Sequence, residues 1–423
     1  MLLRSVTITD LRSPHHGQTL DVRIEDGIIT ALANEVAAGD GEEIFHHAGA
    51  RLAPGFVDIG AYLGDPGHEE REDIASLTAA AAAGGYVAVA VLPNTDPVRQ
   101  SIADMTYLAS HNGRGPVDLL PLAALSRDTA GRDLTEMMEL AGAGALAFTD
   151  GPGRSAPGSL LKRGLEYAKS FGGTVMDTPY DDGLAEDGQI HEGTVSVSLG
   201  LRGIPEMAET IPLSRDLTIL SYTGGRLLLH LLSSAAGLQL IDEYRSGGGD
   251  RLVGTTVSAH HLTFTDESLS SFDPNYKVLP PLRAAEDREA LRRGVLDGRI
   301  DAVVSHHRAR HGEEKDLEFS YASFGARGLE TAFRQLLPWV DGPAQLDRVV
   351  EAFSAGPRRL LGLPPLTIDE GSAAQLTLFT TEGGRRFTSE QLRGKTANSP
   401  LLGQELPGRI LATVNNDRLW TSA

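Results

Sequence analysis

The chain has 423 residues and carries 57 acidic against 38 basic side chains, which gives a formal net charge of −19. Nucleic acids and anionic membranes would repel such a chain, so we expect neither as a partner. The chain contains no cysteine, so disulfides and thiolate metal ligands are excluded, and any transition-metal site must use His, Asp, Glu or a modified Lys.

The N-terminal segment is predicted to form short strands. Residues 5–13 and 19–33 alternate apolar and polar side chains, and Asp26-Gly27 is a hairpin-turn pair. The C-terminal segment is similar, with alternation over residues 373–381 and 408–417. We therefore expect residues 1–52 and 367–423 to form one composite domain, a small β-sandwich.

Residues 53–366 alternate predicted strands and helices, and most of the helices end at glycine. Eight such units favour a distorted TIM (β/α)8 barrel over an open doubly wound sheet. The predicted strands cover residues 55–63, 86–93, 117–125, 145–151, 174–177, 226–232, 252–259 and 300–307.

No signal peptide is predicted, because residues 1–13 lack a long apolar core. No later stretch reaches about 18 uninterrupted apolar residues, the length of a membrane span. We expect a cytoplasmic protein.

A barrel places its active site at the C-terminal ends of its strands. A metal hydrolase needs several His and carboxylate side chains there, starting with two ligands at positions i and i+2 of the first strand. In this chain those positions hold Gly60 and Tyr62. Glycine has no side chain to offer, and a phenol is a poor zinc ligand, so the frame of the site is present without its first ligands.

Several motifs in order resemble those of dihydroorotases, members of the cyclic amidohydrolase family, of the type that works with aspartate transcarbamoylase. The resemblance covers nearly the whole chain and implies the barrel fold. The motifs are LAPGFVDI, LGDPGHEEREDI, LPNTDPV, GALAFTDG, EGTVSVSLGLRGIPEMAE, YTGGRLLLHLLSS, HHLTFTDE, LPPLR with EDREAL, and NSPLLGQEL.

Aligned on these motifs, the chain departs from the family at the positions that carry the chemistry. The family's His-x-His falls on Gly60 and Tyr62, and its substrate-binding Arg falls on Gly64. Its catalytic Asp becomes His306, and its Asn before Pro-Pro-Leu-Arg becomes Leu279. The resemblance thus implies that metal, base and substrate anchor have been lost together.

A few positions still match. Asp150 and His230 align with family metal ligands, Asn94 aligns with a substrate contact, and Asp177 or a neighbour replaces a family His. Each also has an ordinary structural explanation: a turn for Asp150, a locally bonded histidine for His230 and backbone capping for Asn94. Two ligands do not hold a catalytic zinc.

The resemblance therefore implies a catalytically inactive dihydroorotase homologue. Such a chain would act as a structural subunit for the catalytic chain of aspartate transcarbamoylase in pyrimidine biosynthesis, as a homodimer within a larger hetero-oligomer. No catalytic residue and no cofactor are expected on this interpretation.

The alternative is a divergent metal-dependent cyclic amidohydrolase, so the chain's status as an enzyme stays open. Its rebuilt one-zinc site would use Asp150, Asp177, His230 and His306, which follow strands four, five, six and eight. Zinc is expected only on this alternative.

Overall fold

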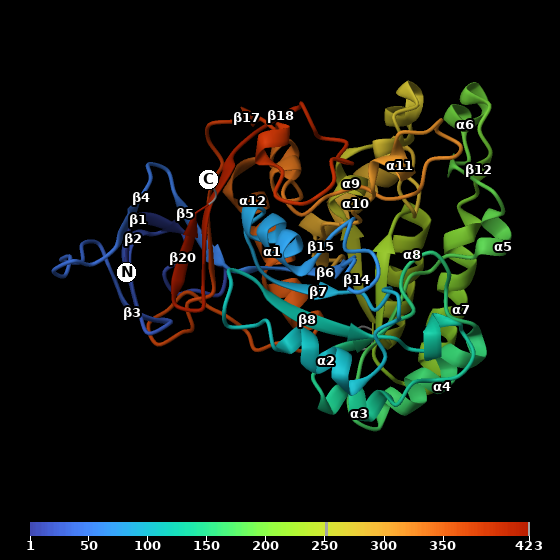
Figure 1. The fold of residues 1–423 in the computed structure, drawn as a ribbon, viewed down its shortest axis with the longest axis horizontal. Coiled ribbons are helices and arrows are strands. Elements are labelled where there is room, and N and C mark those ends of the chain that lie inside the picture. Colours follow the sequence, from blue (N-terminus) through green and yellow to red (C-terminus); the bar gives the residue numbers. More distant parts are fainter. Residues whose placement is uncertain (250–252, 422–423) are drawn as a thin grey trace.

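The computed structural model describes residues 1–249 and 253–421. Strands from the middle of the chain form an eight-stranded parallel sheet in the order β15-β14-β13-β10-β9-β8-β7-β6 (Figure 1). The predicted distorted TIM barrel is confirmed. The strands are β6 Phe56–Ala61, β7 Tyr86–Val91, β8 Asp118–Ala123, β9 Ala147–Phe148, β10 Val175–Asp177, β13 Leu227–Leu232, β14 Val253–Ser258 and β15 Ala302–Val304.

Helices alternate with these strands along the chain and surround the sheet. The first of them begins at a capping box, in which the side chains of Asp73 and Ser76 each accept from the other's backbone N–H. The helices are α1 Ile74–Ala83, α2 Ile102–Ala109, α3 Met137–Gly142, α4 Gly158–Lys169, α7 Met207–Thr223, α8 Ala235–Tyr244, α10 Ala285–Leu296 and α12 Gly342–Phe353.

Shorter elements interrupt this alternation. Between β10 and α7 the chain makes an excursion whose α6 and β12 lie at the upper right of Figure 1. The short elements are α5 Asp182–Ala185, β11 Ile190–His191, α6 Thr194–Leu199, β12 Gly203–Ile204, α9 Ala259–Thr263, α11 Gly312–Lys315 and α13 Ala355–Leu360.

Strands from both chain ends share a second sheet, at the left of Figure 1, in the order β20-β19-β16-β5-β1-β2-β3, with β4 beside β1. The short strands β17 and β18 pair separately. The strands are β1 Leu2–Ile8, β2 Thr19–Glu25, β3 Ile28–Ala33, β4 Ile44–His46, β5 Arg51–Pro54, β16 Leu376–Thr380, β17 Arg385–Arg386, β18 Glu405–Leu406, β19 Arg409–Asn415 and β20 Arg418–Thr421.

Buried aromatic rings join this sheet to the barrel. Phe56, at the start of β6, lies with its ring centroid 5.0 Å from that of Phe333 and 5.4 Å from that of Phe353. Phe379 of β16 contacts Phe333 at 4.9 Å. The backbone N–H of Phe56 also donates to Oγ1 of Thr377 at 3.1 Å. The start of the first barrel strand is therefore fixed from the terminal sheet.

A buried carboxyl group links the two edge strands of the barrel sheet. Asp58 of β6 accepts from the backbone N–H of Ser305 at 2.7 Å and from its hydroxyl at 2.6 Å, one residue beyond β15. Four residues further along the first strand segment, the N–H of Tyr62 donates to the carbonyl of His307 at 3.0 Å. We call this junction the β6–β15 seam.

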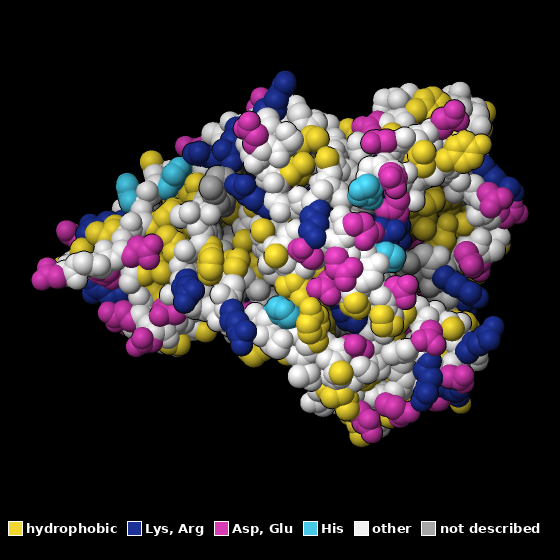
Figure 2. Space-filling view, viewed as in Figure 1, with side chains coloured by type: hydrophobic (Ala, Val, Ile, Leu, Met, Phe, Trp, Pro, Cys, Tyr) yellow, Lys and Arg dark blue, Asp and Glu magenta, His cyan; other side chains and the backbone are white. Residues whose placement is uncertain are grey.

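The face of the molecule in Figure 2 carries acidic and basic side chains interspersed, without one continuous basic area. None of the helices in the described part of the chain is long and apolar enough to cross a membrane.

The seam yields a stability prediction. Burial raises the pKa of Asp58 to about 6, and the bonds from Ser305 oppose that rise. Ser305→Ala removes one donor from a buried carboxylate, so we expect the free energy of unfolding to fall by about 1–3 kcal/mol at neutral pH. Urea denaturation measures this. Ser271→Ala, at an exposed position, should stay within about 0.5 kcal/mol of the parent; equal effects of the two variants would contradict the role of the seam.

Candidate functional site

Four buried histidines gather at the C-terminal ends of the barrel strands. His230 lies in β13, His260 and His261 lie in α9 directly after β14, and His306 follows β15. The ring centroid of His306 is 6.4 Å from that of His260 and 6.2 Å from that of His261. We call these four residues the histidine cluster.

The protonated nitrogen can be assigned in two of these rings. Nε2 of His306 lies 3.1 Å from the carbonyl of Leu279, and Nε2 of His261 lies 3.1 Å from the carbonyl of Pro281. Since a carbonyl oxygen only accepts, each Nε2 carries the proton and each Nδ1 has a free lone pair. Neither Nδ1 has a hydrogen-bond partner among the described residues. The segment that lost the family's Asn at Leu279 therefore sets the tautomers of two imidazoles through its backbone.

The ring of His230 explains why glycine stands at position 60. A Cβ added to Gly60 would lie 2.5 Å from Nε2 of His230, and the φ of Gly60 is +86°. Both facts exclude a larger residue without a rearrangement. Nδ1 of His230 lies 2.9 Å from the hydroxyl of Thr256. The first vacant ligand position is thus filled by a neighbouring histidine ring.

Burial keeps the cluster uncharged. Loss of solvent lowers the pKa of His230 and His261 to about 3 and that of His260 to about 4. The pKa of His306 is held well below its usual range by burial and by the other imidazoles. At neutral pH these rings are neutral, and burial disfavours their protonation.

The two aspartates of the predicted zinc site are engaged elsewhere. Asp150 accepts from the backbone N–H of Ser126 at 2.8 Å and from its hydroxyl. Asp177 accepts from the N–H of Ala156 at 3.0 Å, and burial together with the neighbouring carboxyl of Asp216 raises its pKa well above the usual range. Both carboxyls serve local networks.

The structure therefore brings together only two of the four residues of that site, His230 and His306. Among the described residues, no group of three or more His, Asp or Glu side chains is arranged to hold a metal ion. The side chains as they lie do not fit the zinc that the alternative required, because Asp150 and Asp177 are held in separate networks.

A pocket of about 230 Å³ opens at the same end of the barrel. It connects the ends of β6 and β7 to the chain after β15. Its lining includes Tyr62, Gly64, Arg71, Asn94, Arg308 and Arg310.

Asn94 faces this pocket with one free group. Its Nδ2 donates to the carbonyl of Asp150 at 2.9 Å, while its Oδ1 has no partner among the described residues. Gly151 leaves the room for this side chain, because a Cβ there would lie 2.0 Å from Oδ1. Asn94 thus supports the backbone, and its unpartnered Oδ1 is buried against Gly151.

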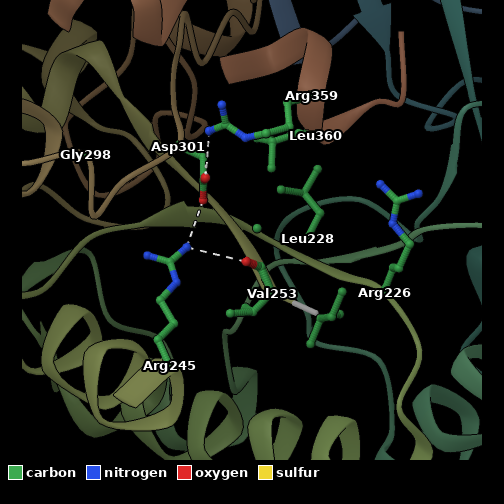
Figure 3. Close-up of a pocket in the computed structure, with 10 residues that line it drawn as sticks. Arg226, Leu228, Arg245, Val253, Gly298, Asp301, Arg359 and Leu360 are labelled. Atoms are coloured by element: carbon green, nitrogen blue, oxygen red, sulfur yellow. Dashed lines mark hydrogen bonds and ion pairs between the residues drawn. The ribbon is translucent and has the colours of Figure 1, made fainter. Parts of the chain in front are cut away.

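A larger pocket of about 440 Å³ lies at the opposite end of the barrel, near the starts of β13 and β14 (Figure 3). Two of its three arginines are already paired: Arg245 and Arg359 lie 2.8 and 2.9 Å from the two carboxylate oxygens of Asp301. Active sites of such barrels lie at the other end, so size alone does not identify the site.

Comparison with known proteins places the chain in a family. A family model described as "Dihydro-orotase-like" matches residues 49–235. The dihydroorotase of Syntrophobacter fumaroxidans is 38% identical, over 94% of this chain and 92% of the relative. That of Deinococcus radiodurans is 36% identical over 97% of both chains.

Solved structures agree on the fold. L-Hydantoinase (dihydropyrimidinase) from Arthrobacter aurescens superposes with a TM-score of 0.84 at 21% identity, over 99% of this chain and 95% of the other. Dihydropyrimidinase from Brevibacillus agri gives 0.82 at 20% identity, over 99% and 94%. At this identity the likeness concerns the fold alone.

These relatives overturn the interpretation of the chain as an inactive scaffold. Proteins named for the dihydroorotase activity match it at 34–38% identity over nearly their full length. The prediction equated vacant ligand positions with lost catalysis. It did not account for the histidine rings that other strands bring to the same place, so the cyclic amidohydrolase alternative fits better.

Some residues of the site were missed from the sequence. His260 and His261 are not among the site residues predicted from the sequence, yet both join the cluster. The free lone pairs depend on backbone carbonyls at Leu279 and Pro281, which no side-chain motif reveals. Arg308 is also absent from the predicted site, although a cation two residues after a strand-end histidine is a signal that could have marked it.

The neutral histidines predict acid sensitivity. Below about pH 6.5 the imidazoles of the unfolded chain become protonated, whereas the buried imidazoles of the folded chain stay neutral. The unfolded state therefore binds more protons. As a result, the free energy of unfolding falls as the pH falls from about 6.5 toward the pKa values of the folded chain. Each buried histidine can contribute up to about 1.4 kcal/mol per pH unit in that window. Urea denaturation from pH 7.5 to 5.5 should show the slope, and His230→Gln should reduce it by up to that amount. The control is His46→Gln, at the exposed His46. If His230→Gln kept the parent's dependence of unfolding free energy on pH, the account would be contradicted.

Proposed function

Since the chain belongs to the dihydroorotase-like family, we propose that it hydrolyses a cyclic amide of the dihydroorotate class in the pocket at the C-terminal end of the barrel. The observation that carries the proposal is the uncharged His306 imidazole, which has a free Nδ1 lone pair and stands where the family has its catalytic aspartate. The names of the full-length relatives support the reaction class.

Nδ1 of His306 is the ring nitrogen that has no partner, although burial and the neighbouring imidazoles hold the pKa of this ring well below its usual range. Its proton is fixed on Nε2 by the carbonyl of Leu279, so Nδ1 can accept a proton from a water molecule that attacks the ring carbonyl. The new C–O bond forms as the water proton moves to Nδ1. The ring C–N bond then breaks, and the same proton passes to the leaving nitrogen. The product is an open-chain acid, and the imidazole returns to its starting form.

The backbone around the cluster is held in an uncommon conformation. His306 has φ +55°, and Leu231, which follows His230, has φ +61°. Non-glycine residues rarely adopt these angles, and such strain gathers at functional sites. It turns the histidines away from the regular strand direction at the ends of β13 and β15.

A partnership with the catalytic chain of aspartate transcarbamoylase, with this chain as a homodimer in the larger assembly, stays a prediction from the resemblance. Size-exclusion chromatography with light scattering of the two mixed chains tests it. A species heavier than either component is expected, and separate elution would contradict the prediction.

Removal of the proton acceptor tests the proposed function. We choose His306→Asn because asparagine tolerates a positive φ better than most residues. The kcat for ring opening of dihydroorotate should fall by about 10²–10⁴-fold, the usual contribution of general base catalysis, with KM little changed. The measurement is the loss of the substrate's amide absorbance.

The matched control is His46→Asn in β4, on the terminal sheet, for which the parent kcat is expected. A His306→Asn enzyme that folds and keeps the parent kcat would remove His306 from the reaction. A parent protein without any turnover of dihydroorotate, dihydrouracil or hydantoin would remove the proposed function itself.

A further inference from the structure

We propose that Arg308 binds the carboxylate of the ligand and so replaces the arginine that the chain lacks at Gly64. This inference deepens the proposed function, on which it rests, by naming the residue that selects a carboxylated ring. Arg308 and Gly64 line the same pocket, from the chain after β15 and the chain after β6.

The charge of Arg308 is the unused one in this pocket. Nε of Arg71 lies 2.9 Å from Glu314, and Nη1 of Arg310 lies 2.7 Å from the same carboxylate. The guanidinium of Arg308 has no carboxylate within ion-pair distance and no hydrogen bond from its side chain among the described residues. In a chain with a net charge of −19, a cation left unpaired beside a pocket favours an anionic ligand.

The guanidinium is held in place before any ligand arrives. Its central carbon lies 4.3 Å from the ring centroid of Tyr62, a stacked cation–π arrangement. The stem packs against Gly325, where an added Cβ would lie 3.0 Å from Cδ of Arg308. The backbone N–H of Arg308 donates to Ala326 at 2.8 Å, and its carbonyl accepts from Asn398 at 3.1 Å. A guanidinium whose paired N–H donors are already held in place loses less conformational entropy when it binds a carboxylate.

The original position of the arginine is closed. A Cβ at Gly64 would lie 2.1 Å from the carbonyl oxygen of His68 and 2.6 Å from that of Glu72. These are backbone atoms, which a flexible side chain cannot push aside. Any guanidinium in this pocket must therefore come from another wall, and Tyr62, at the vacant ligand position, provides the surface on which Arg308 rests.

The pocket fits a small ligand with one carboxylate. Its 230 Å³ lies below the roughly 300–1,000 Å³ typical of sites for drug-sized ligands. One free guanidinium matches one carboxylate in a planar two-bond contact. Among cyclic amides and ureides, this guanidinium selects those that carry a ring carboxylate.

The test compares two probes by isothermal titration calorimetry at one salt concentration: dihydroorotate, and dihydrouracil, the same ring without the carboxylate. The parent should bind dihydroorotate about 10–100-fold more tightly, in line with a hydrogen-bonded pair of opposite charges. Arg308→Gln should reduce that preference to within about threefold and leave dihydrouracil binding unchanged. Arg308→Lys keeps the positive charge and removes the planar pair of N–H donors, so it should keep part of the preference for dihydroorotate.

Arg71→Gln is the matched control, since it removes an arginine of the same pocket that Glu314 already neutralises. It should keep the parent preference, and thermal melts confirm that each variant is folded. A parent-like preference in Arg308→Gln, or a parent protein that binds neither probe, overturns the inference. Binding preference without turnover would reject the proposed hydrolysis and still support Arg308 as the anchor, so the two failures are distinct.

Discussion

The β6–β15 seam positions the segment that carries His306 and Arg308. The carboxyl of Asp58 is bonded to both donors of Ser305, which sets where the chain leaves β15. His306 and Arg308 follow within three residues, and Tyr62 is joined to the same turn by its backbone. The imidazole assigned as base and the guanidinium assigned as anchor thus lie on one short segment. A shift of this seam would move both together relative to β6.

The second constraint is electrostatic. A cluster of imidazoles can be buried because each is neutral, whereas the same number of charged rings would repel one another and lose their hydration. The backbone carbonyls of Leu279 and Pro281 fix which nitrogen carries the proton in two of the rings. The strand ends therefore combine neutral imidazoles with an unpaired cation at the wall of the pocket, an arrangement suited to a neutral ring with one anionic group.

The sequence was sufficient to predict the barrel, because each of its eight strands is an apolar run that follows or precedes a helix-forming segment. It was also sufficient to identify Gly60, Tyr62 and Gly64 as positions without family side chains. The sequence was insufficient to predict which side chains occupy the space at these positions. The ring of His230 against Gly60, and the stacking of Arg308 on Tyr62, join residues about 170 and 246 positions apart. Such contacts depend on the closed barrel, and no local pattern encodes them.

The error in function had the same origin. The departures from the family at Gly60, Tyr62, Gly64, His306 and Leu279 were taken as a vacant site, although side chains from β13, α9 and the turn after β15 gather at the strand ends. The rebuilt zinc site failed for a related reason: Asp150 and Asp177 follow strands that end at the barrel mouth, yet local donors and a second carboxyl hold them in separate networks. The positions of Asp150 and Asp177 at the strand ends could be predicted from the sequence, whereas the directions of their side chains could not.

The central claim is that this chain opens a cyclic amide by adding water. The most direct test is to incubate the purified protein with dihydroorotate in H₂¹⁸O and to analyse the product of a single turnover by mass spectrometry. The account predicts an open-chain acid with one ¹⁸O in the new carboxylate, formed at a rate that rises in proportion to protein concentration. Unchanged dihydroorotate without label, at protein concentrations at which binding is saturated, would contradict it.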